Sequence, residues 1–248
     1  MDEKIRRLAD IMKFSKRIVF FGGAGVSTAS NIPDFRSSHG IFNKQLRAHL
    51  TPEQLVSHTI FSSNPEVFFD FYRHNLLYPN AQPNGCHIAL ARLERMGKLK
   101  AIVTQNIDGL HQAAGSKKVY EIHGSIHRNF CMGCGKFYPM EYIYNFDGVP
   151  RCTDCGEIIR PDIVLYEEGL NQQVMSEALN AITLANTLIV GGSSLVVYPA
   201  AGLLDYFKGN NLVIINKTPT HVDRDANLVI NDDVSVVMKE AVDLLAES

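Results

Sequence analysis

The sequence predicts an α/β protein with a doubly wound parallel sheet and a second, smaller domain. Two observations point to the sheet. Short apolar runs alternate with amphipathic helical segments at both ends of the chain, which is the order of a parallel sheet. Two of these runs end in turns rich in glycine and serine, at the edge where such sheets bind ligands. The smaller domain is indicated by two interruptions of the alternation, at residues 39–83 and 126–157.

The first half of the alternation starts at the N-terminus. Apolar side chains recur at helical spacing over residues 5–12, and residues 17–21 (RIVFF) have the pattern of a buried strand. A helix is expected at 84–96, where Gly97 ends it, and strands at 100–103 and 119–124.

The second half lies closer to the C-terminus. Strands are expected at 158–166, 187–190, 211–215 and 228–230, and helices at 174–185, 200–207 and 234–245. We therefore assign residues 1–38, 84–125 and 158–248 to the large domain.

The first interruption, residues 39–83, contains aromatic side chains but no apolar run of strand type. Thr51-Pro52 and Asn64-Pro65 each have the form of a helix start, with proline in the first turn. We interpret this segment as a helical insert, and its aromatic side chains as core rather than as a binding surface.

Composition excludes several classes of protein. The 248 residues, 46% of them hydrophobic, are enough for a full core, and 24 basic against 26 acidic side chains argue against direct nucleic-acid binding. The charged N-terminus does not resemble a signal peptide, and no apolar run reaches the roughly 20 residues that span a bilayer. Five cysteines without a secretion signal favour metal thiolates in a reducing cytoplasm over disulfides.

The stretch Gly22–Arg36 (GGAGVSTASNIPDFR) is a candidate phosphate site. Glycines at a strand-to-helix turn let a phosphate approach the backbone amides, and Ser27 can bind phosphate or cap a helix. An ordinary tight turn explains the same pattern, so the stretch alone leaves both interpretations open. Thr28 replaces the third glycine of the dinucleotide fingerprint, and no acidic residue ends a strand about 20 residues later. A hydride-transferring dehydrogenase is therefore disfavoured, and Asn216 at a later strand end becomes the candidate for the ribose contact.

Polar side chains follow two further strands. The segment 104–111 (TQNIDGLH) comes after one strand, and His123-Gly124 ends the next. A histidine that titrates near neutrality suits a general base. His127 is the rival base, and Asn106 and Asp108 have an alternative role as helix caps.

Four of the cysteines form two Cys-x-x-Cys pairs separated by 17 residues: Cys131, Cys134, Cys152 and Cys155. This spacing predicts one tetrahedral Zn²⁺ site in the insert 126–157. Four thiolates leave no open position on the metal, so we expect a structural rather than a catalytic ion; a redox role for either pair is the weaker alternative.

Together these motifs resemble the sirtuins of bacterial type, which are NAD-dependent protein-lysine deacylases. GAGVS (23–27), IPDFR (32–36), TQNIDGLH, HG (123–124), the double cysteine motif and GSSLVVYP (192–199) occur in the family's order over about residues 5–245. The resemblance implies a Rossmann-like large domain, with a small domain made of the helical insert and the zinc-binding insert. It also implies deacetylation of acetyl-lysine in proteins, with transfer of the acetyl group to ADP-ribose and release of nicotinamide.

The resemblance assigns roles residue by residue. His123 is implied as the general base that deprotonates a ribose hydroxyl. The implied NAD contacts are Ala24, Gly25, Ser27, Phe35, Arg36, Gln105, Asn106, Asp108, Gly192, Ser193, Ser194 and Asn216. Among these, Phe35 and Arg36 belong to a loop over the nicotinamide ribose, and Asp108 binds the carboxamide. The substrate peptide is implied to pair as a strand near Val164 and Val197.

Three positions depart from the family pattern. Asn31 replaces a glycine, and asparagine tolerates left-handed backbone angles. Ser37 replaces another glycine and is expected to stiffen the covering loop. Glu167 replaces a glycine beside the peptide cleft, so we expect a preference for basic residues that flank the modified lysine.

The acyl group can also be predicted from the resemblance. Family members that remove succinyl groups carry Tyr-x-x-Arg in the helical insert, whereas the matching segment here is Tyr72-Arg73-His74-Asn75. We therefore expect acetyl and other apolar acyl groups over succinyl. A mono-ADP-ribosyltransferase and a non-catalytic NAD or acetyl-peptide sensor remain as alternative functions on the same fold.

Overall fold

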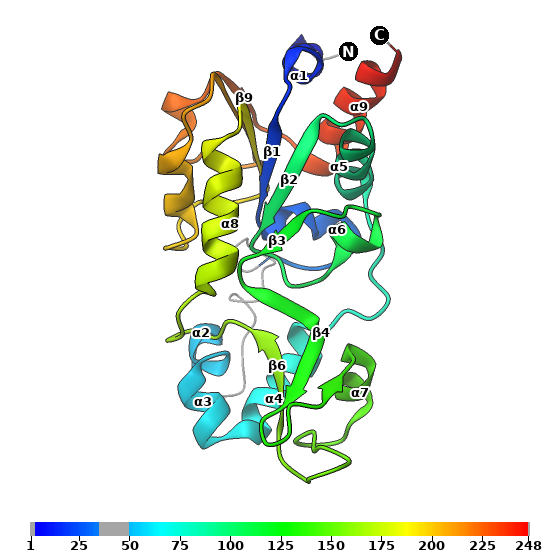
Figure 1. The fold of residues 1–248 in the computed structure, drawn as a ribbon, viewed down its shortest axis with the longest axis vertical. Coiled ribbons are helices and arrows are strands. Elements are labelled where there is room, and N and C mark those ends of the chain that lie inside the picture. Colours follow the sequence, from blue (N-terminus) through cyan, green and yellow to red (C-terminus); the bar gives the residue numbers. More distant parts are fainter. Residues whose placement is uncertain (1–2, 35–49, 248) are drawn as a thin grey trace.

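The computed structural model describes residues 3–34 and 50–247. Six parallel strands form the main sheet in the order β3-β2-β1-β7-β8-β9 (Figure 1). The strands are β1 (Ile18–Gly22), β2 (Leu99–Thr104), β3 (Val119–Glu121), β7 (Thr187–Gly191), β8 (Asn211–Ile215) and β9 (Leu228–Ile230). The order runs outward from β1 in both directions, which confirms the doubly wound parallel sheet.

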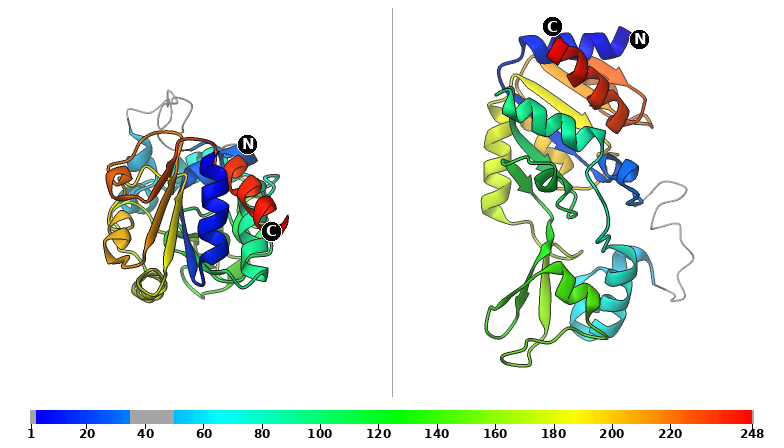
Figure 2. Two further views of the ribbon diagram at one scale, coloured as in Figure 1. Left: turned by 90° about the horizontal axis from the view of Figure 1, so that it is seen from above. Right: turned by 90° about the vertical axis from the view of Figure 1, so that its right-hand side faces the viewer.

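Helices cover both faces of this sheet. One face packs against α1 (Glu3–Phe14), α5 (Gly85–Arg95) and α9 (Val234–Glu247), and the other against α8 (Gln172–Thr183) and the 3₁₀ helix η4 (Ala201–Tyr206) (Figure 2). Side chains alternate along β1, so Phe20 enters the first core and Phe21 the second. The sheet is thus buried on both sides, as its nearly continuous apolar strands predict.

The small domain lies at the opposite end of the molecule from the two termini (Figure 1). It combines three short helices, α2 (Pro52–Leu55), α3 (His58–Ser63) and α4 (Pro65–Asn75), with an antiparallel sheet and α7 (Met140–Asn145). The sheet has the order β5-β4-β6, formed by β4 (Gly124–Cys131), β5 (Phe137–Tyr138) and β6 (Ile159–Ile163).

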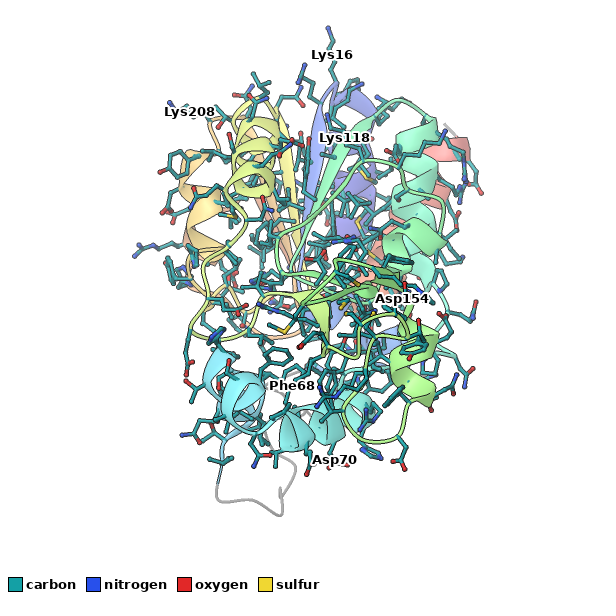
Figure 3. All side chains as sticks on the ribbon, turned by 60° about the horizontal axis from the view of Figure 1, so that its bottom comes forward. Lys16, Phe68, Asp70, Lys118, Asp154 and Lys208 are labelled. Atoms are coloured by element: carbon teal, nitrogen blue, oxygen red, sulfur yellow. The ribbon has the colours of Figure 1, made fainter. Side chains whose placement is uncertain are left out.

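The aromatic side chains of the helical insert are core, as expected. Phe68, Phe69 and Tyr72 on α4 are fully buried in one cluster with Phe61 and with side chains of the antiparallel sheet. Phe68 lies inside this domain, whereas Lys16 projects from the far end of the large domain (Figure 3). The predicted helix starts are also present, because the side chains of Thr51 and Asn64 cap α2 and α4.

Two elements differ from expectation. The strand predicted at 158–166 is shorter, and β6 pairs with β4 in the small sheet instead of joining the parallel sheet. An apolar run fixes the strand but not its partner, which depends on contacts distant in sequence. The helix predicted at 200–207 is the 3₁₀ helix η4. The assignment of residue ranges to the two domains remains a prediction. The strands β4 and β6 run between the large and the small domain.

Short elements connect the strands at the carboxyl edge of the main sheet. These are η1 (Ala24–Val26), η2 (Thr28–Ser30), α6 (Leu110–Ala113) and η5 (Asp223–Asp225). Asn31 closes η2 with φ 63°, so the left-handed turn survives the loss of glycine there. Within the described ranges, every helix is too short or too polar to cross a membrane.

Candidate functional site

A cleft of about 1040 Å³ lies at the carboxyl edge of the parallel sheet and reaches the small domain. It brings together every predicted NAD, catalytic and peptide residue that the structure describes. These are Ala24, Gly25, Ser27, Gln105, Asn106, Asp108, His123, Val164, Glu167, Gly192, Ser193, Ser194, Val197 and Asn216. Phe35, Arg36 and Ser37 lie outside the described residues. The predicted site residues therefore line one cleft, whereas the ligand that each of them binds remains a prediction.

The two glycine-rich turns interlock at the floor of the cleft. The amide of Gly25 donates to the carbonyl of Gly192 at 2.8 Å, and a Cβ on Gly25 would lie 2.8 Å from the Gly192 Cα. Gly192 itself has φ +58°, and a Cβ there would approach the Val26 nitrogen to 2.4 Å. Glycine is therefore required at both positions, and together they form a small-residue cradle in which backbone groups can approach a phosphate.

A polar network connects the first turn with the segment after β2. The Ser27 hydroxyl donates to Asp108 Oδ2 at 2.6 Å and accepts from the Asn106 side chain at 3.0 Å. The other carboxylate oxygen, Asp108 Oδ1, accepts from the amide of Leu110, the first residue of α6, although the N-cap position itself is occupied by Gly109. This hydrogen bond and a ligand role are compatible, because a carboxylate can accept several hydrogen bonds.

His123 lies between β3 and β4 with its ring against the segment after β2. Its Nδ1 donates to the Gln105 carbonyl at 3.0 Å, so the neutral ring carries its lone pair on Nε2. Burial lowers the pKa of His123 below its ordinary value of 6.5, and the hydrogen bond to Gln105 opposes that shift. The ring is therefore neutral at pH 7 and able to accept a proton.

The two neighbouring histidines are placed differently. The Nε2 of His127 is hydrogen-bonded to the Asp108 carbonyl at 3.0 Å, and the residue is not among the described residues that line the cleft. His111 is fully buried beside His87, with ring centroids 4.7 Å apart. Four histidines lie at and after the TQNIDGLH segment, and in the described chain only His123 lines the cleft, whereas His111, His127 and His221 do not.

Val164, which follows β6, and Val197, which follows β7, line the side of the cleft where the sequence predicts the peptide. The Val164 amide donates to the His123 carbonyl at 2.9 Å, which ties this side directly to the histidine. Glu167 is exposed and has φ +77°, which is unusual for a residue with a side chain.

Some residues of the cleft were missed from the sequence. Lys217 and Thr218 follow β8, and Asp232 and Val234 surround the start of α9. A usable signal existed, since each pair follows a strand of the same parallel sheet, where ligand sites gather.

The four cysteines converge at the tip of the small domain. Their sulfur atoms all lie within 4.8 Å of one another. Zn–S bonds of about 2.3 Å in a tetrahedron require sulfur separations of about 3.8 Å, so the cluster has the size of a four-thiolate metal site. Cys152 Sγ also accepts hydrogen bonds from the Tyr138 hydroxyl and the Asp154 amide, which hold a ligand of this kind in place.

Comparison with known proteins gives a consistent result. The model of the Sir2 family matches residues 23–199. The chain is 60% identical to an NAD-dependent protein deacetylase of Clostridium perfringens, over 98% of this chain and 100% of the relative. It is 54% identical to the protein of the same name from Clostridium acetobutylicum, over 97% of this chain and 98% of the relative.

Solved structures agree with the sequence relatives. A structure described as Sir2 with a p53 peptide and NAD⁺ has a TM-score of 0.85 and 38% identity, with 100% of both chains covered. A Sir2 structure with a deacetylated p53 peptide and 3′-O-acetyl ADP ribose has a TM-score of 0.87 and 39% identity, covering 97% of this chain and 98% of the other.

Proposed function

The chain belongs to the Sir2 family, and on this premise we propose that it is an NAD-dependent protein-lysine deacetylase. The enzyme transfers the acetyl group of acetyl-lysine to ADP-ribose and releases nicotinamide. One observation carries the proposal: a single cleft joins the interlocked glycine turns, His123, Val164 and Val197. NAD and a peptide can therefore meet at the histidine.

The glycine cradle supports NAD binding. Gly25 and Gly192 have no side chains, so the two turns leave their backbone groups open to a phosphate. Ser193 and Ser194, which follow Gly192, offer hydroxyl groups to a pyrophosphate. Asn216 lies at the end of β8, where it is in reach of the adenosine side, and Ser27, Asn106 and Asp108 form the polar wall at the nicotinamide side. NAD acts here as a substrate that is cleaved.

His123 performs the proton transfer. An alcohol is a weak nucleophile, so the ribose hydroxyl that attacks the acyl carbon must lose a proton. The neutral ring accepts this proton on Nε2, and the Gln105 carbonyl stabilises the resulting imidazolium through Nδ1. Closure of the cleft by the segment that carries Phe35 and Arg36 would limit attack by water, as the family pattern implies.

The second substrate is an acetylated lysine in a protein. We propose that its backbone adds as a strand between Val164 and Val197. The carboxylate of Glu167 lies at this side of the cleft and favours basic residues next to the acetyl-lysine. Peptides with acidic flanks should therefore react more slowly than peptides with basic flanks, and Glu167→Gly should reduce the difference.

The acyl group is acetyl or another apolar group. Among the described residues that line the cleft, the only lysine or arginine is Lys217, which forms an ion pair with Asp233 near the adenosine side. Arg73 instead donates to the Gly148 carbonyl. A succinyl carboxylate would thus lack a cationic partner in the described cleft, and equal turnover of succinylated and acetylated peptide would contradict this preference.

The cysteine cluster fits one structural Zn²⁺ held by Cys131, Cys134, Cys152 and Cys155. The ion would fix the loops of the antiparallel sheet, and its closed ligand set leaves no place for substrate. We further propose a cytoplasmic protein, because thiolate ligands persist in a reducing compartment, and one without direct nucleic-acid or membrane partners.

The deciding experiment follows NAD and an acetyl-lysine peptide by mass spectrometry. Equal amounts of nicotinamide, free lysine peptide and acetyl-ADP-ribose are expected. ADP-ribose attached to protein would indicate a mono-ADP-ribosyltransferase instead, and NAD binding without turnover would indicate a sensor. His123→Ala, which should bind NAD but form the products far more slowly, is the matched control.

A further inference from the structure

Glu167 occupies a backbone conformation that normally selects glycine. The Glu168 amide donates to the Leu165 carbonyl at 3.1 Å, which closes a four-residue turn with Glu167 at its third position. Its φ of +77° is the value of that position in a type II turn, where glycine or asparagine is preferred. A glutamate is disfavoured there unless its side chain provides a compensating interaction.

The side chain provides such an interaction with the helical insert. Glu167 Oε2 accepts hydrogen bonds from the Thr59 amide at 3.0 Å and from the Thr59 hydroxyl at 2.7 Å. Both bonds end on a carboxylate, and hydrogen bonds to an ionised acceptor are about twice as strong as neutral ones. The two residues are 108 positions apart in sequence, so the contact fixes two separate segments to each other.

Backbone pairing and an ion-pair cluster surround this contact. The Tyr166 amide donates to the Val56 carbonyl, and the His58 amide donates to the Tyr166 carbonyl. Glu168 on the other side of Glu167 binds His58 Nδ1 at 2.8 Å and the Arg160 guanidinium at 2.6 Å. The loop from Val164 to Glu168, which we term the 164–168 loop, is thus attached through its last three residues to the segment 56–59 at the start of α3.

The same loop forms one wall of the cleft and contacts the catalytic histidine. Residues 164–168 all line the cleft, and the Val164 amide binds the His123 carbonyl. A peptide that pairs with this wall needs the loop in a single position. Any interaction that fixes the loop before the peptide arrives lowers the entropy cost of binding.

We propose that Glu167 and Thr59 form a latch that holds the 164–168 loop on α3 in the conformation that binds peptide. Glu167 acts as a positioning residue in this role, and the proposal rests on the deacetylase function proposed above. The latch differs from the electrostatic preference for basic flanks. It depends on the two hydrogen bonds, whereas the preference depends on the negative charge.

Thr59→Val tests the latch without a change of charge. It removes the hydroxyl donor, keeps the shape of the side chain, and leaves the Thr59 amide in place. With an acetyl-lysine peptide that has uncharged flanks, we expect the peptide KM to rise about fivefold, with kcat and the NAD KM within about twofold of the unmodified enzyme. Ser63→Ala is the matched control, because Ser63 lies on the same helix and, among the described residues, its hydroxyl donates to the Thr59 carbonyl and not to the 164–168 loop.

Variants of Glu167 complete the test. Glu167→Gly removes the latch and adopts φ +77° without strain, so it separates a lost contact from a misfolded turn. We expect about a tenfold rise in the peptide KM for Glu167→Gly, and a smaller rise for Glu167→Gln, which keeps an acceptor oxygen. Thr59→Val should add little to Glu167→Gly, because the two changes remove one interaction.

Hydrogen–deuterium exchange provides a measurement that does not depend on activity. Thr59→Val should speed exchange of the amides at 56–59 and 164–168, with the rest of the chain unchanged. Unaltered exchange and an unaltered peptide KM in Thr59→Val would overturn the latch, as would fully additive effects in the double variant. If the unmodified enzyme forms no acetyl-ADP-ribose, the deacetylase proposal fails, and the exchange result still decides whether the latch exists.

Discussion

Two histidines buried under the cleft should make the stability of the fold depend on pH. His87 on α5 and His111 on α6 are both fully buried and in contact. Burial lowers the pKa of His87 to about 4, against an opposing effect of Asp108. Burial also places the pKa of His111 well below 6.5, and its neighbour His87 lowers it further. The native state therefore holds both rings neutral.

The sign and size of the effect follow from this difference. A pKa that is lower in the folded than in the unfolded state contributes stability above pH 6.5, and this contribution is lost as the pH falls toward the folded value. The unfolded chain binds a proton at each histidine below the ordinary pKa of 6.5, whereas the folded chain does so only as the pH approaches the lowered pKa. For His87, with a pKa of about 4, the loss of stability between pH 7.5 and 5.0 is about 2 kcal/mol, and His111 adds a loss of the same sign. The free energy of unfolding should thus drop by more than about 2 kcal/mol, in a pH range above that in which ordinary carboxyl groups titrate.

Urea unfolding at pH 7.5 and 5.0 measures this drop. In His111→Leu it should shrink to about 2 kcal/mol, because one of the two groups is gone. The replacement removes no hydrogen bond within the described chain, since neither ring nitrogen of His111 has a partner there. His74→Gln, at an exposed position, is the control and should retain the full drop. A drop in His111→Leu as large as that of the unmodified protein would refute the assignment.

Three further predictions concern the site. The value of kcat/KM should fall at low pH with an apparent pKa below 6.5, because His123 must be neutral to accept a proton and burial lowers its pKa. His123→Ala should lower kcat about 10²- to 10⁴-fold, while calorimetry should show that NAD binding is retained. Gly25→Ala should weaken NAD binding by about 1–3 kcal/mol, since its Cβ would meet the Gly192 backbone, whereas Gly169→Ala, with open space around it, should not. Treatment with a chelator should release one Zn²⁺ per chain and destabilise the fold. A decrease of about 2 kcal/mol in the free energy of unfolding would lower the melting temperature by about 4–8 °C. An unchanged melting temperature after metal removal would contradict a structural role.

The parts of the site that could be predicted from sequence are those determined by local chemistry. Glycine at positions 25 and 192 is needed because the two turns touch through their backbones. The polar residues after β2 lie in the cleft because all strands of a parallel sheet present the same edge. The same logic, applied to the ends of β8 and β9, would have found Lys217 and Asp232.

The parts that could not be predicted depend on partners distant in sequence. Residues 159–163 form a strand as expected, but their pairing with β4 rather than with the parallel sheet is set by the whole small domain. The sequence shows Glu167 as a negative charge in place of a glycine beside the predicted cleft. Its hydrogen bonds to Thr59 depend on how the helical insert packs, which no local pattern encodes.

The position of His123 explains why a two-residue motif can mark a catalytic site. Two hydrogen bonds and one turn fix the histidine: Nδ1 donates to the Gln105 carbonyl, the His123 carbonyl accepts from the Val164 amide, and Gly124 turns with φ +80°. A Cβ on Gly124 would lie 2.0 Å from the Asp162 carbonyl oxygen, so the chain can enter β4 beside β6 only with glycine there. The side chains around His123 can therefore differ without moving the histidine, because main-chain contacts orient its ring toward the cleft. Under the proposed function, substrate selection then depends on residues such as Glu167, which follows β6 and lines the same cleft.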